Sequence, residues 1–303
     1  MGKTFSQQKT NVGSQVQDTS SALATKIGVW LNDKYRDIWR RVAWPAVTDD
    51  DYTFESVTSQ VNYDLPSDFE EELFMANIAQ GYALKRQIQG ARWRDRTSAY
   101  QADSIPNGTP HSYDILPEVI NSSGVPLGVI RLDPPPAVAE TYAMPYKRRH
   151  VDLLGTTGTC DTDTASKIIA SASTFITDLV QPGMRVKNTT DTTYGYVTSV
   201  DSETQLTMDT DLCPDGDETF TISNETLIPD IEWMMELGAI GEAWAYKRDF
   251  AKANYYLNRY EIEVRRRIGQ ERSKINQRYQ NVSESFRSPH SRHLLGEQSY
   301  DTV

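Results

Sequence analysis

The chain has 303 residues, of which 38% are hydrophobic and 24% charged, and its formal net charge is −11. No run approaches the roughly 18 apolar residues of a membrane span. Two cysteines, Cys160 and Cys213, are too few for a disulfide-dense secreted fold or a four-thiolate metal site. An acidic protein is a poor general binder of nucleic acid, because phosphate contacts need positive surface.

A polar stretch followed by an amphipathic helix is predicted for the N-terminal part of the chain. Residues 1–22 are rich in Ser, Thr and Gln, so we expect a flexible N-terminal arm. Ser20 or Ser21 is suited to cap the helix, and Trp44-Pro45 ends it, because a residue before proline avoids the α region. Apolar side chains recur every three or four residues, as on one helical face. This face consists of Leu23, Ile27, Leu31, Tyr35, Ile38 and Val42.

Short β-strands are predicted for residues 51–154. The runs YTFESV and QVNYDLP alternate on either side of a polar turn, which predicts a hairpin. The run IRLDPPPAVAETYAMPYKRRH (130–150) predicts a second hairpin with a stiff proline corner, since prolines donate no hydrogen bond. Further strand candidates are LFMANIA, YALKRQI and NGTPHSYDIL, and GARWRDRTSAYQ is a candidate short helix.

Residues 155–222 predict a small inserted all-β domain, because short strand-like runs alternate with Gly, Asp, Thr and Asn turns. Eleven acidic and three basic residues give 154–222 a net charge of 3 − 11 = −8. Its acid-rich loops do not match a calcium-binding EF-hand, since Ile222 stands where the twelfth-position Glu belongs when Asp211 is the first ligand. We expect Cys160 and Cys213 to be reduced, partly buried thiols, with a bond between them as the alternative.

Two consecutive helices are predicted after residue 228. Pro229 suits the first helical position, and Asp249 suits the N-cap of the second helix after a tight turn at 247–249. We expect Trp39, Trp233 and Trp244 to lie in the core. Residues 273–303 lose the helical period and predict an extended C-terminal arm. The apolar positions of the two helices are Ile231, Met234, Met235, Ile240, Trp244 and Ala245, then Phe250, Ala253, Leu257, Tyr260, Val264 and Ile268.

These elements together predict an α+β fold. It comprises a helical bundle (an N-terminal helix plus a C-terminal helix pair), a β-rich middle, an inserted small all-β domain and an extended C-terminal arm. The expected boundaries are 1–22 for the N-terminal arm, 23–154 with 223–272 for a discontinuous core, 155–222 for the inserted domain and 273–303 for the C-terminal arm.

Catalytic motifs do not stand out in the chain. The sequence contains no nucleophile elbow, P-loop or G-x-G-x-x-G motif. Two of the four histidines, His290 and His293, lie in the polar tail. We therefore expect no enzymatic activity, no cofactor and no metal site.

The order of several phrases resembles the head-to-tail adaptor (connector or neck) proteins of tailed bacteriophages, which dock under the portal. The phrases are WLNDKYRDIWRRVAW (30–44), YDLPSDF (63–69), GTPHSYDI (108–115), IRLDPPP, YAMPYKRRHVDLL, IPDIEWMMELGAIGEAWAY and AKANYYLNRYEIEVRRR. The resemblance spans 23–153 and 223–272, and residues 155–222 depart from the compact form of the family.

The resemblance implies a twelve-fold ring that joins the phage head to the neck or tail and continues the DNA channel. The implied partners are further copies of the chain, the portal protein and a downstream neck or tail protein, with tail fibres as a possible partner of 155–222. Genomic DNA would pass through without specific binding, and no membrane is involved. The protein would be assembled in the bacterial host cytoplasm and reside in the virion at the head–tail interface.

Two groups of residues are the candidate interaction sites under this resemblance. The portal-docking arm consists of Arg272, Lys274, Arg278, Tyr279, Phe286, Leu294, Leu295 and Tyr300. The subunit or neck interface consists of Tyr146, Lys147, Arg148, Arg149, Arg265, Arg266 and Arg267. The positive charge of this region supports contact with an acidic partner, because ten basic and four acidic residues give 247–278 a net charge of 10 − 4 = +6.

Two other functions remain open from the sequence. One is an adhesion or glycan- or fibre-binding protein that acts through 155–222, with Tyr194 and Tyr196 as binding residues. The other is a neck stopper or tail-terminator ring. The helical ends of the chain disfavour the second, because those proteins are usually mainly β.

Overall fold

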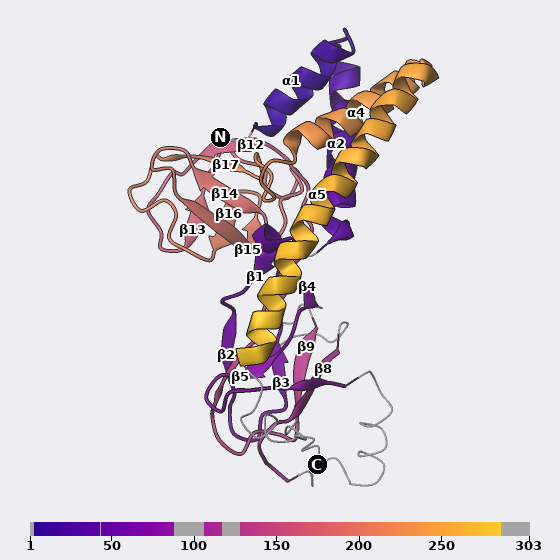
Figure 1. The fold of residues 1–303 in the computed structure, drawn as a ribbon. Coiled ribbons are helices and arrows are strands. Elements are labelled where there is room, and N and C mark those ends of the chain that lie inside the picture. The colour runs from indigo at the N-terminus through magenta and orange to yellow at the C-terminus, as the bar shows by residue number, and fades with distance from the viewer. Residues whose placement is uncertain (1–2, 43, 88–105, 117–127, 286–303) are drawn as a thin grey trace, which may run out of the picture. The chain divides into compact units, whose positions relative to one another are not determined.

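The computed structural model describes residues 3–42, 44–87, 106–116 and 128–285, with side chains up to Arg272. Within these residues the fold is mixed α+β, as expected, and it contains four helices and mostly antiparallel sheets (Figure 1). The chain divides into two compact units. The first unit comprises Met1–Thr48 and Arg148–Ile275, and the second comprises Asp49–Lys147 and Asn276–Val303.

Four helices supply the main apolar core of the first unit: α1 (Phe5–Gln15), α2 (Ser21–Arg41), α4 (Glu232–Tyr246) and α5 (Phe250–Ser285). The Ser20 hydroxyl caps α2 by accepting a hydrogen bond from Leu23 N at 3.4 Å. A 3₁₀ turn at Pro45–Val47 follows α2. The predicted apolar face of α2 is confirmed. Its residues Leu23, Ile27, Leu31, Tyr35 and Ile38 are buried, and Val42 is partly buried against the same core.

Helix α1 corrects the expectation of a flexible arm over 1–22. The Thr4 hydroxyl accepts from Gln7 N (3.3 Å), and the Gln7 side chain accepts from Thr4 N (2.9 Å), which is a capping box. Phe5, Val12 and Val16 are buried in the helical core. Their spacing of seven and four residues is helical, and together with the capping box it was the signal in the sequence.

The predicted turn between α4 and α5 is confirmed, and the Asp249 side chain accepts a hydrogen bond from Lys252 N at 3.2 Å. Helix α4 begins at Glu232, later than Pro229. Trp233 is 36% exposed and Phe250 is 63% exposed. The prediction that both side chains lie in the core is therefore wrong. Helix α5 continues to Ser285, so 273–285 is helical rather than extended.

One six-stranded antiparallel sheet is formed by β12 (Thr156–Thr159), β13 (Lys167–Ile169), β14 (Arg185–Asn188), β15 (Tyr194–Ser202), β16 (Gln205–Met208) and β17 (Thr219–Ile222). The strand order is β12-β17-β14-β15-β16-β13. Alternating strand residues bury one apolar core of their own, which contains Phe175, Val186, Leu206 and Phe220.

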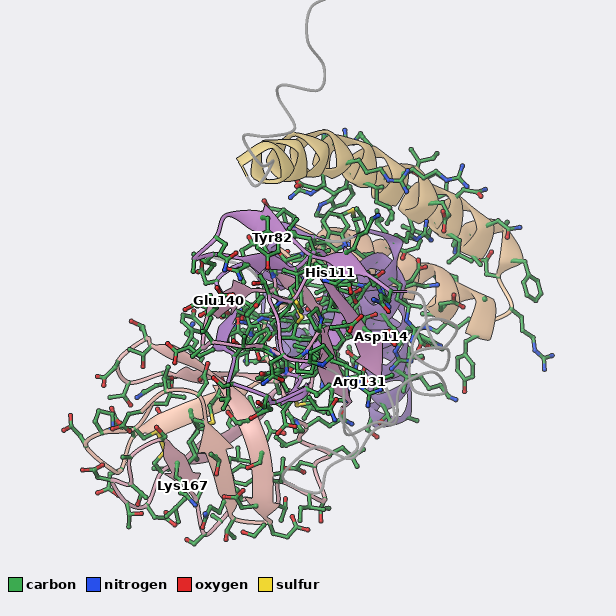
Figure 2. All side chains as sticks on the ribbon, turned by 90° about the horizontal axis from the view of Figure 1, so that it is seen from below. Tyr82, His111, Asp114, Arg131, Glu140 and Lys167 are labelled. Atoms are coloured by element: carbon green, nitrogen blue, oxygen red, sulfur yellow. A yellow bond between two sulfur atoms is a disulfide. The ribbon has the colours of Figure 1, made fainter. Side chains whose placement is uncertain are left out.

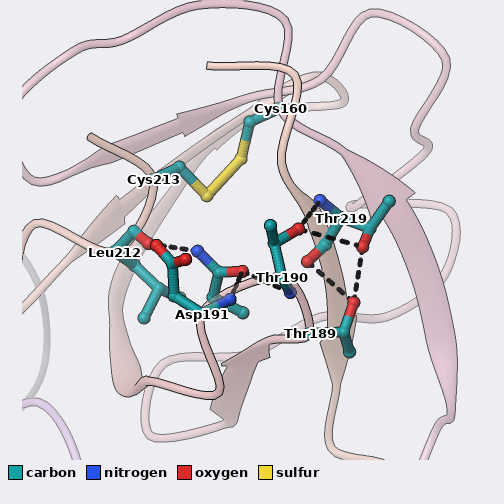
Figure 3. The surroundings of a disulfide bond; sticks show 8 residues. Cys160, Thr189, Thr190, Asp191, Leu212, Cys213 and Thr219 are labelled. Atoms are coloured by element: carbon teal, nitrogen blue, oxygen red, sulfur yellow. Dashed lines mark hydrogen bonds between the residues drawn. A yellow bond between two sulfur atoms is a disulfide. The ribbon is translucent and has the colours of Figure 1, made fainter. Parts of the chain in front are cut away.

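Cys160 and Cys213 form a disulfide, which corrects the expectation of two reduced thiols (Figure 3). Both residues are fully buried in the core of the six-stranded sheet. Cys160 follows β12, and Cys213 lies in the loop before β17, which pairs with β12. The strand pairing therefore brings together two cysteines that are 53 residues apart in the sequence.

The second unit contains short strands in three sheets. One sheet has the order β2-β10-β5-β6, another β3-β9-β8-β7, and a third β1-β11-β4. Strands β7 and β8 are parallel. The strands are β1 (Thr48–Asp49), β2 (Thr53–Glu55), β3 (Asn62–Asp64), β4 (Phe69–Glu72), β5 (Ala76–Asn77), β6 (Tyr82–Ala83), β7 (Lys85–Arg86), β8 (Ser112–Leu116), β9 (Val129–Asp133), β10 (Thr141–Ala143) and β11 (Tyr146–Arg148).

Both predicted hairpins are wrong, although their strands exist. Strand β2 pairs with β10 and β3 with β9, so the two halves of the first hairpin lie in different sheets. Strands β9 and β10 also belong to different sheets. The physical reason lies in β9, which is buried on both faces and pairs with β3 and β8, while the prolines after it end the ladder. The candidate helix at 90–101 lies outside the described residues.

The core of the second unit is rich in tyrosine, and polar side chains surround it. Tyr63, Tyr113, Tyr142 and Tyr146 are buried together with Phe69, Ile130 and Leu132. Figure 2 labels Tyr82, whose hydroxyl donates to Pro110 O (2.5 Å), and Glu140, which accepts from Asn77 Nδ2 (2.6 Å). Burial raises the pKa of Tyr142, so this phenol stays neutral.

Candidate interaction surfaces

Tyr146 and Lys147 are buried, so they do not present the predicted interface. The Tyr146 hydroxyl donates to the Asp68 carboxylate at 2.7 Å, and its ring meets Tyr52 edge-on at 5.5 Å. Lys147 is 6% exposed and pairs with Glu70 at 3.3 Å. Both side chains therefore stabilise the second unit. The run YKRRH has four consecutive basic or potentially basic residues after Tyr146, so the sequence did not reveal this burial.

Arg148 and Arg149 lie on the first unit and differ in environment. The Arg148 guanidinium lies 4.1 Å from the centre of the Tyr196 ring, a cation–π contact, and its carbonyl accepts from Trp39 Nε1 at 3.2 Å. Arg149 is exposed. Of the four predicted residues at 146–149, Arg149 is therefore the one whose side chain lies on the surface.

The three consecutive arginines of α5 divide between surface and packing. Arg265 and Arg266 side chains are 79% and 65% exposed, and each forms an ion pair along the helix, with Glu261 and Glu263. Such exposed pairs contribute little to stability. Arg267 is 25% exposed in its side chain and pairs with Glu271 at 3.5 Å. The predicted basic surface thus includes Arg265 and Arg266 and largely excludes Arg267.

The predicted portal-docking arm is described only in part. Arg272 is an exposed residue of α5. Lys274, Arg278 and Tyr279 lie in α5, although their side chains are outside the described set. The remaining predicted anchors, Phe286, Leu294, Leu295 and Tyr300, lie outside the described residues. The arm stays a prediction, with its first part changed from extended to helical.

A charged network connects α2 with α5. Arg41 donates to Asp37 (2.6 Å) and to Glu261 (2.6 Å), and the Tyr260 hydroxyl donates to Asp37 (2.6 Å). Burial raises the pKa of Asp37, but the hydrogen bonds from Arg41 and Tyr260 outweigh burial, so the net pKa is lowered. The bond from Arg41 also lowers the pKa of Glu261. Both carboxylates therefore stay ionised at neutral pH and hold the two helices together.

Tyr194 and Tyr196, the candidate glycan-binding residues, have cations over their rings. Arg185 and Lys187 lie 4.8 Å and 5.4 Å from the Tyr194 ring centre, and Arg148 covers Tyr196. Tyr194 is 45% exposed. Sugars stack on open aromatic faces, so cations on these faces disfavour a sugar platform.

Several exposed apolar side chains were missed by sequence reasoning. In the loop between β13 and β14 they are Ile176 and Leu179, and on α5 they are Tyr255 and Ile262. The helical period would have placed Tyr255 and Ile262, seven residues apart, on the face opposite to Ala253, Tyr260 and Val264. No comparable period exists in the loop that carries Ile176 and Leu179.

Two open grooves meet at Lys3 and Trp233 in the first unit. One, of about 450 Å³, is lined by Asn11, Glu236, Tyr256 and Arg259 as well. The other, of about 660 Å³, adds Arg185 and Glu225. The Lys3 Nζ atom forms an ion pair with Glu236 Oε2 at 2.7 Å. The grooves mix both charges and lack a convergent set of reactive groups, so they do not define a catalytic site.

Comparison with known proteins matches no family model and no curated protein. Over the part of the chain that the structure describes, no three His, Cys, Asp or Glu side chains converge as metal ligands would. No helix in the same residues has the length and apolar character needed to cross a bilayer.

Proposed function

We propose that the chain is a structural virion protein that forms a ring beneath the portal of a tailed bacteriophage. The ring would join the head to the neck or tail and continue the DNA channel, with no enzymatic activity. The observation that carries the proposal is that the three helical adaptor-like phrases, far apart in the sequence, meet in one core. Tyr35 of the first phrase, Met235 of the helix introduced by Ile-Pro and Val264 of the last phrase are buried in the same cluster.

The finer arrangement of the fold belongs to the same proposal. Helices α2, α4 and α5 would form the adaptor bundle, and 155–222 would be an inserted all-β domain. Support for the second point is that β12–β17 pair with one another in one sheet and bury their own core. The strongly acidic composition also suits a conduit, because a negative channel repels passing DNA rather than holding it.

Truncation after Ser285 tests the portal-docking part of this function. The cut leaves α5 complete as described, and the unfolding temperatures of the truncated and full chains are compared as the control for folding. We expect it to lose attachment to portal-bearing heads, because few apolar anchors dominate the affinity of a segment that orders on binding. Attachment is measured by cosedimentation with purified heads.

Two matched variants sharpen the test. Replacement of the anchors Phe286, Leu294, Leu295 and Tyr300 by alanine should reproduce the truncation. Replacement of Ser288 and Ser291 by alanine in the same segment should leave attachment unchanged. Normal attachment by the truncated chain would contradict the docking role of the arm.

A further inference from the structure

The loop between β13 and β14 exposes two large apolar side chains. Ile176 is 54% and Leu179 68% exposed, whereas Phe175 and Val180 are buried in the core of the sheet. A hydrogen bond from Leu179 N to Ile176 O (3.0 Å) closes a turn within the loop. The buried residues therefore anchor a short segment, the 174–180 loop, whose other apolar residues face solvent.

Hydrogen bonds to one carboxylate hold this loop. The Glu203 carboxylate accepts hydrogen bonds from Ile176 N (3.0 Å), Thr177 N (3.1 Å) and the Thr177 hydroxyl (2.8 Å). Leu179 has a φ of +60°, in the left-handed region that branched L side chains rarely adopt. A glycine would avoid this strain. A large apolar side chain that is exposed on a strained backbone is a candidate for contact with another molecule.

Negative charge surrounds the 174–180 loop. Residues 171–183 contain Asp178 and neither lysine nor arginine. Glu203 accepts hydrogen bonds from the loop. Asp201, two residues before Glu203, pairs with Lys167, which Figure 2 labels, at 3.4 Å, so the negative charge at the loop comes from Asp178 and Glu203. A complementary surface therefore needs apolar contacts and a positively charged rim.

The outer face of α5 has both properties. Tyr255 is 59% and Ile262 65% exposed, and their spacing of seven residues places them on one face, here named the α5 stripe. Every charged residue that is exposed on α5, as far as side chains are described, is basic. These residues are Lys252, Arg259, Arg265, Arg266 and Arg272.

Gly269 extends the α5 stripe by another seven residues. A Cβ atom at Gly269 would meet nothing within 4 Å, so no contact in the described chain requires glycine there. Glycine is unfavourable inside a helix because it loses more conformational freedom than other residues. Gly269 therefore leaves the helix backbone open on the α5 stripe, with room for a side chain of another molecule.

We propose that the 174–180 loop of one copy docks on the α5 stripe of the next copy, with Leu179 packing against the backbone at Gly269. The acidic surroundings of the loop would then face Arg265 and Arg266. Because the two surfaces differ, the contact is heterologous and repeats from copy to copy. The contact could form without the proposed function. Only the closure of repeated copies into a ring rests on that function.

Two complementary variants of the full chain test this contact. The loop variant combines Ile176→Ser with Leu179→Gly, which suits the positive φ, and the stripe variant is Gly269→Leu. We expect each to associate with itself at least tenfold more weakly than the wild type in sedimentation velocity. An equal mixture should form a one-to-one dimer and stop there, because each variant keeps one intact surface.

Matched controls and a crosslink make the outcome decisive. Tyr194→Ser on the same sheet and Gln270→Leu beside Gly269 should leave association unchanged. A photoreactive benzoylphenylalanine at position 262 should crosslink to 174–180 of another copy. Crosslinks elsewhere on a copy or to another protein, wild-type association by both variants, or a mixture without dimers would overturn the contact. Wild-type rings that are insensitive to both variants would leave the proposed function standing, whereas a wild type that never associates would overturn both.

Discussion

Helices α4 and α5 are consecutive in the chain, yet they are attached to the first unit in different ways. Nine residues of α4 are buried, including Met234, Met235 and Ile240 in the apolar core. Helix α5 buries a narrow line, among them Ala253, Tyr260 and Val264, and part of its attachment is the charged network at Arg41. The sequence of a mostly buried helix is determined by packing in the core, whereas the exposed face of a helix that is buried on one side can also be determined by contacts with partners.

The glycines of α4 and α5 also differ in how closely other atoms pack against them. A Cβ atom at Gly238 would lie 2.7 Å from Lys34 Cγ, and one at Gly241 would lie 2.7 Å from Leu257 Cγ and 3.2 Å from Leu257 N. These two glycines are explained by close packing within the chain. Gly269 in α5 has no such neighbour.

Met235→Ala should have the largest effect on stability among these changes. Met235 is fully buried in the core. Removing its side chain should lower the free energy of unfolding by about 2–5 kcal/mol, because apolar contacts are lost and a cavity is left. Urea denaturation measures the change. Asn258→Ala on the exposed face of α5 is the control and should stay within about 0.5 kcal/mol of the wild type. A similar small change for Met235→Ala would mean that α4 is not packed as described.

Alanine at the two kinds of glycine should act in opposite directions. Gly241→Ala should destabilise by about 1–3 kcal/mol, because the new methyl group meets the backbone of Leu257 as well as its side chain. Gly269→Ala should stabilise by about 0.5–1 kcal/mol, because alanine is the better helix former. Both are measured by denaturation at protein concentrations at which copies do not associate. Destabilisation by Gly269→Ala under those conditions would reveal a contact within the chain.

Periodic segments could be predicted from the sequence, and pairing between short strands could not. The helical face at Leu23, Ile27 and Leu31 and the turn before α5 follow from local spacing and capping. The hairpins failed because β2, β3 and β10 have three residues each, so local pattern specifies where a strand lies but not its partner. The burial of β9 decides the pairing, and burial is a property of the whole unit.

The candidate sites show the same limit. Arg265 and Arg266 lie on the surface as expected, because helical period separates them from the buried line. Tyr146 and Lys147 were assigned to an interface from the resemblance to the adaptor proteins, and their contacts with Asp68 and Glu70 in the second unit could not be predicted. The exposure of Leu179 depends on a backbone conformation that no residue pattern announces.

Arg41→Met should destabilise the chain less than Met235→Ala at neutral pH, and its distinguishing property is that the loss of stability depends on pH. It removes the bonds to Asp37 and Glu261 and should cost about 1 kcal/mol, since bonds to charged groups contribute about 1.5–3 kcal/mol and partial exposure screens them. The folded-state pKa values of Asp37 and Glu261 are lowered. Their stabilisation is therefore present above the unfolded-state pKa values of about 4 and is lost as the pH falls through the folded-state values.

The wild type should consequently lose more stability than Arg41→Met as the pH falls below about 4, and the two unfolding curves should converge in acid. Added salt should reduce the difference in free energy of unfolding between the wild type and Arg41→Met at neutral pH, because the network is partly exposed. Arg40→Met is the control, since Arg40 is exposed on the same helix and should not change the pH profile. Met235→Ala should keep its full effect at both pH values, because α4 is held by apolar contacts. If the stability difference between Arg41→Met and the wild type stays constant in acid, α5 is held by the packing of its buried residues, as α4 is, and not by charge.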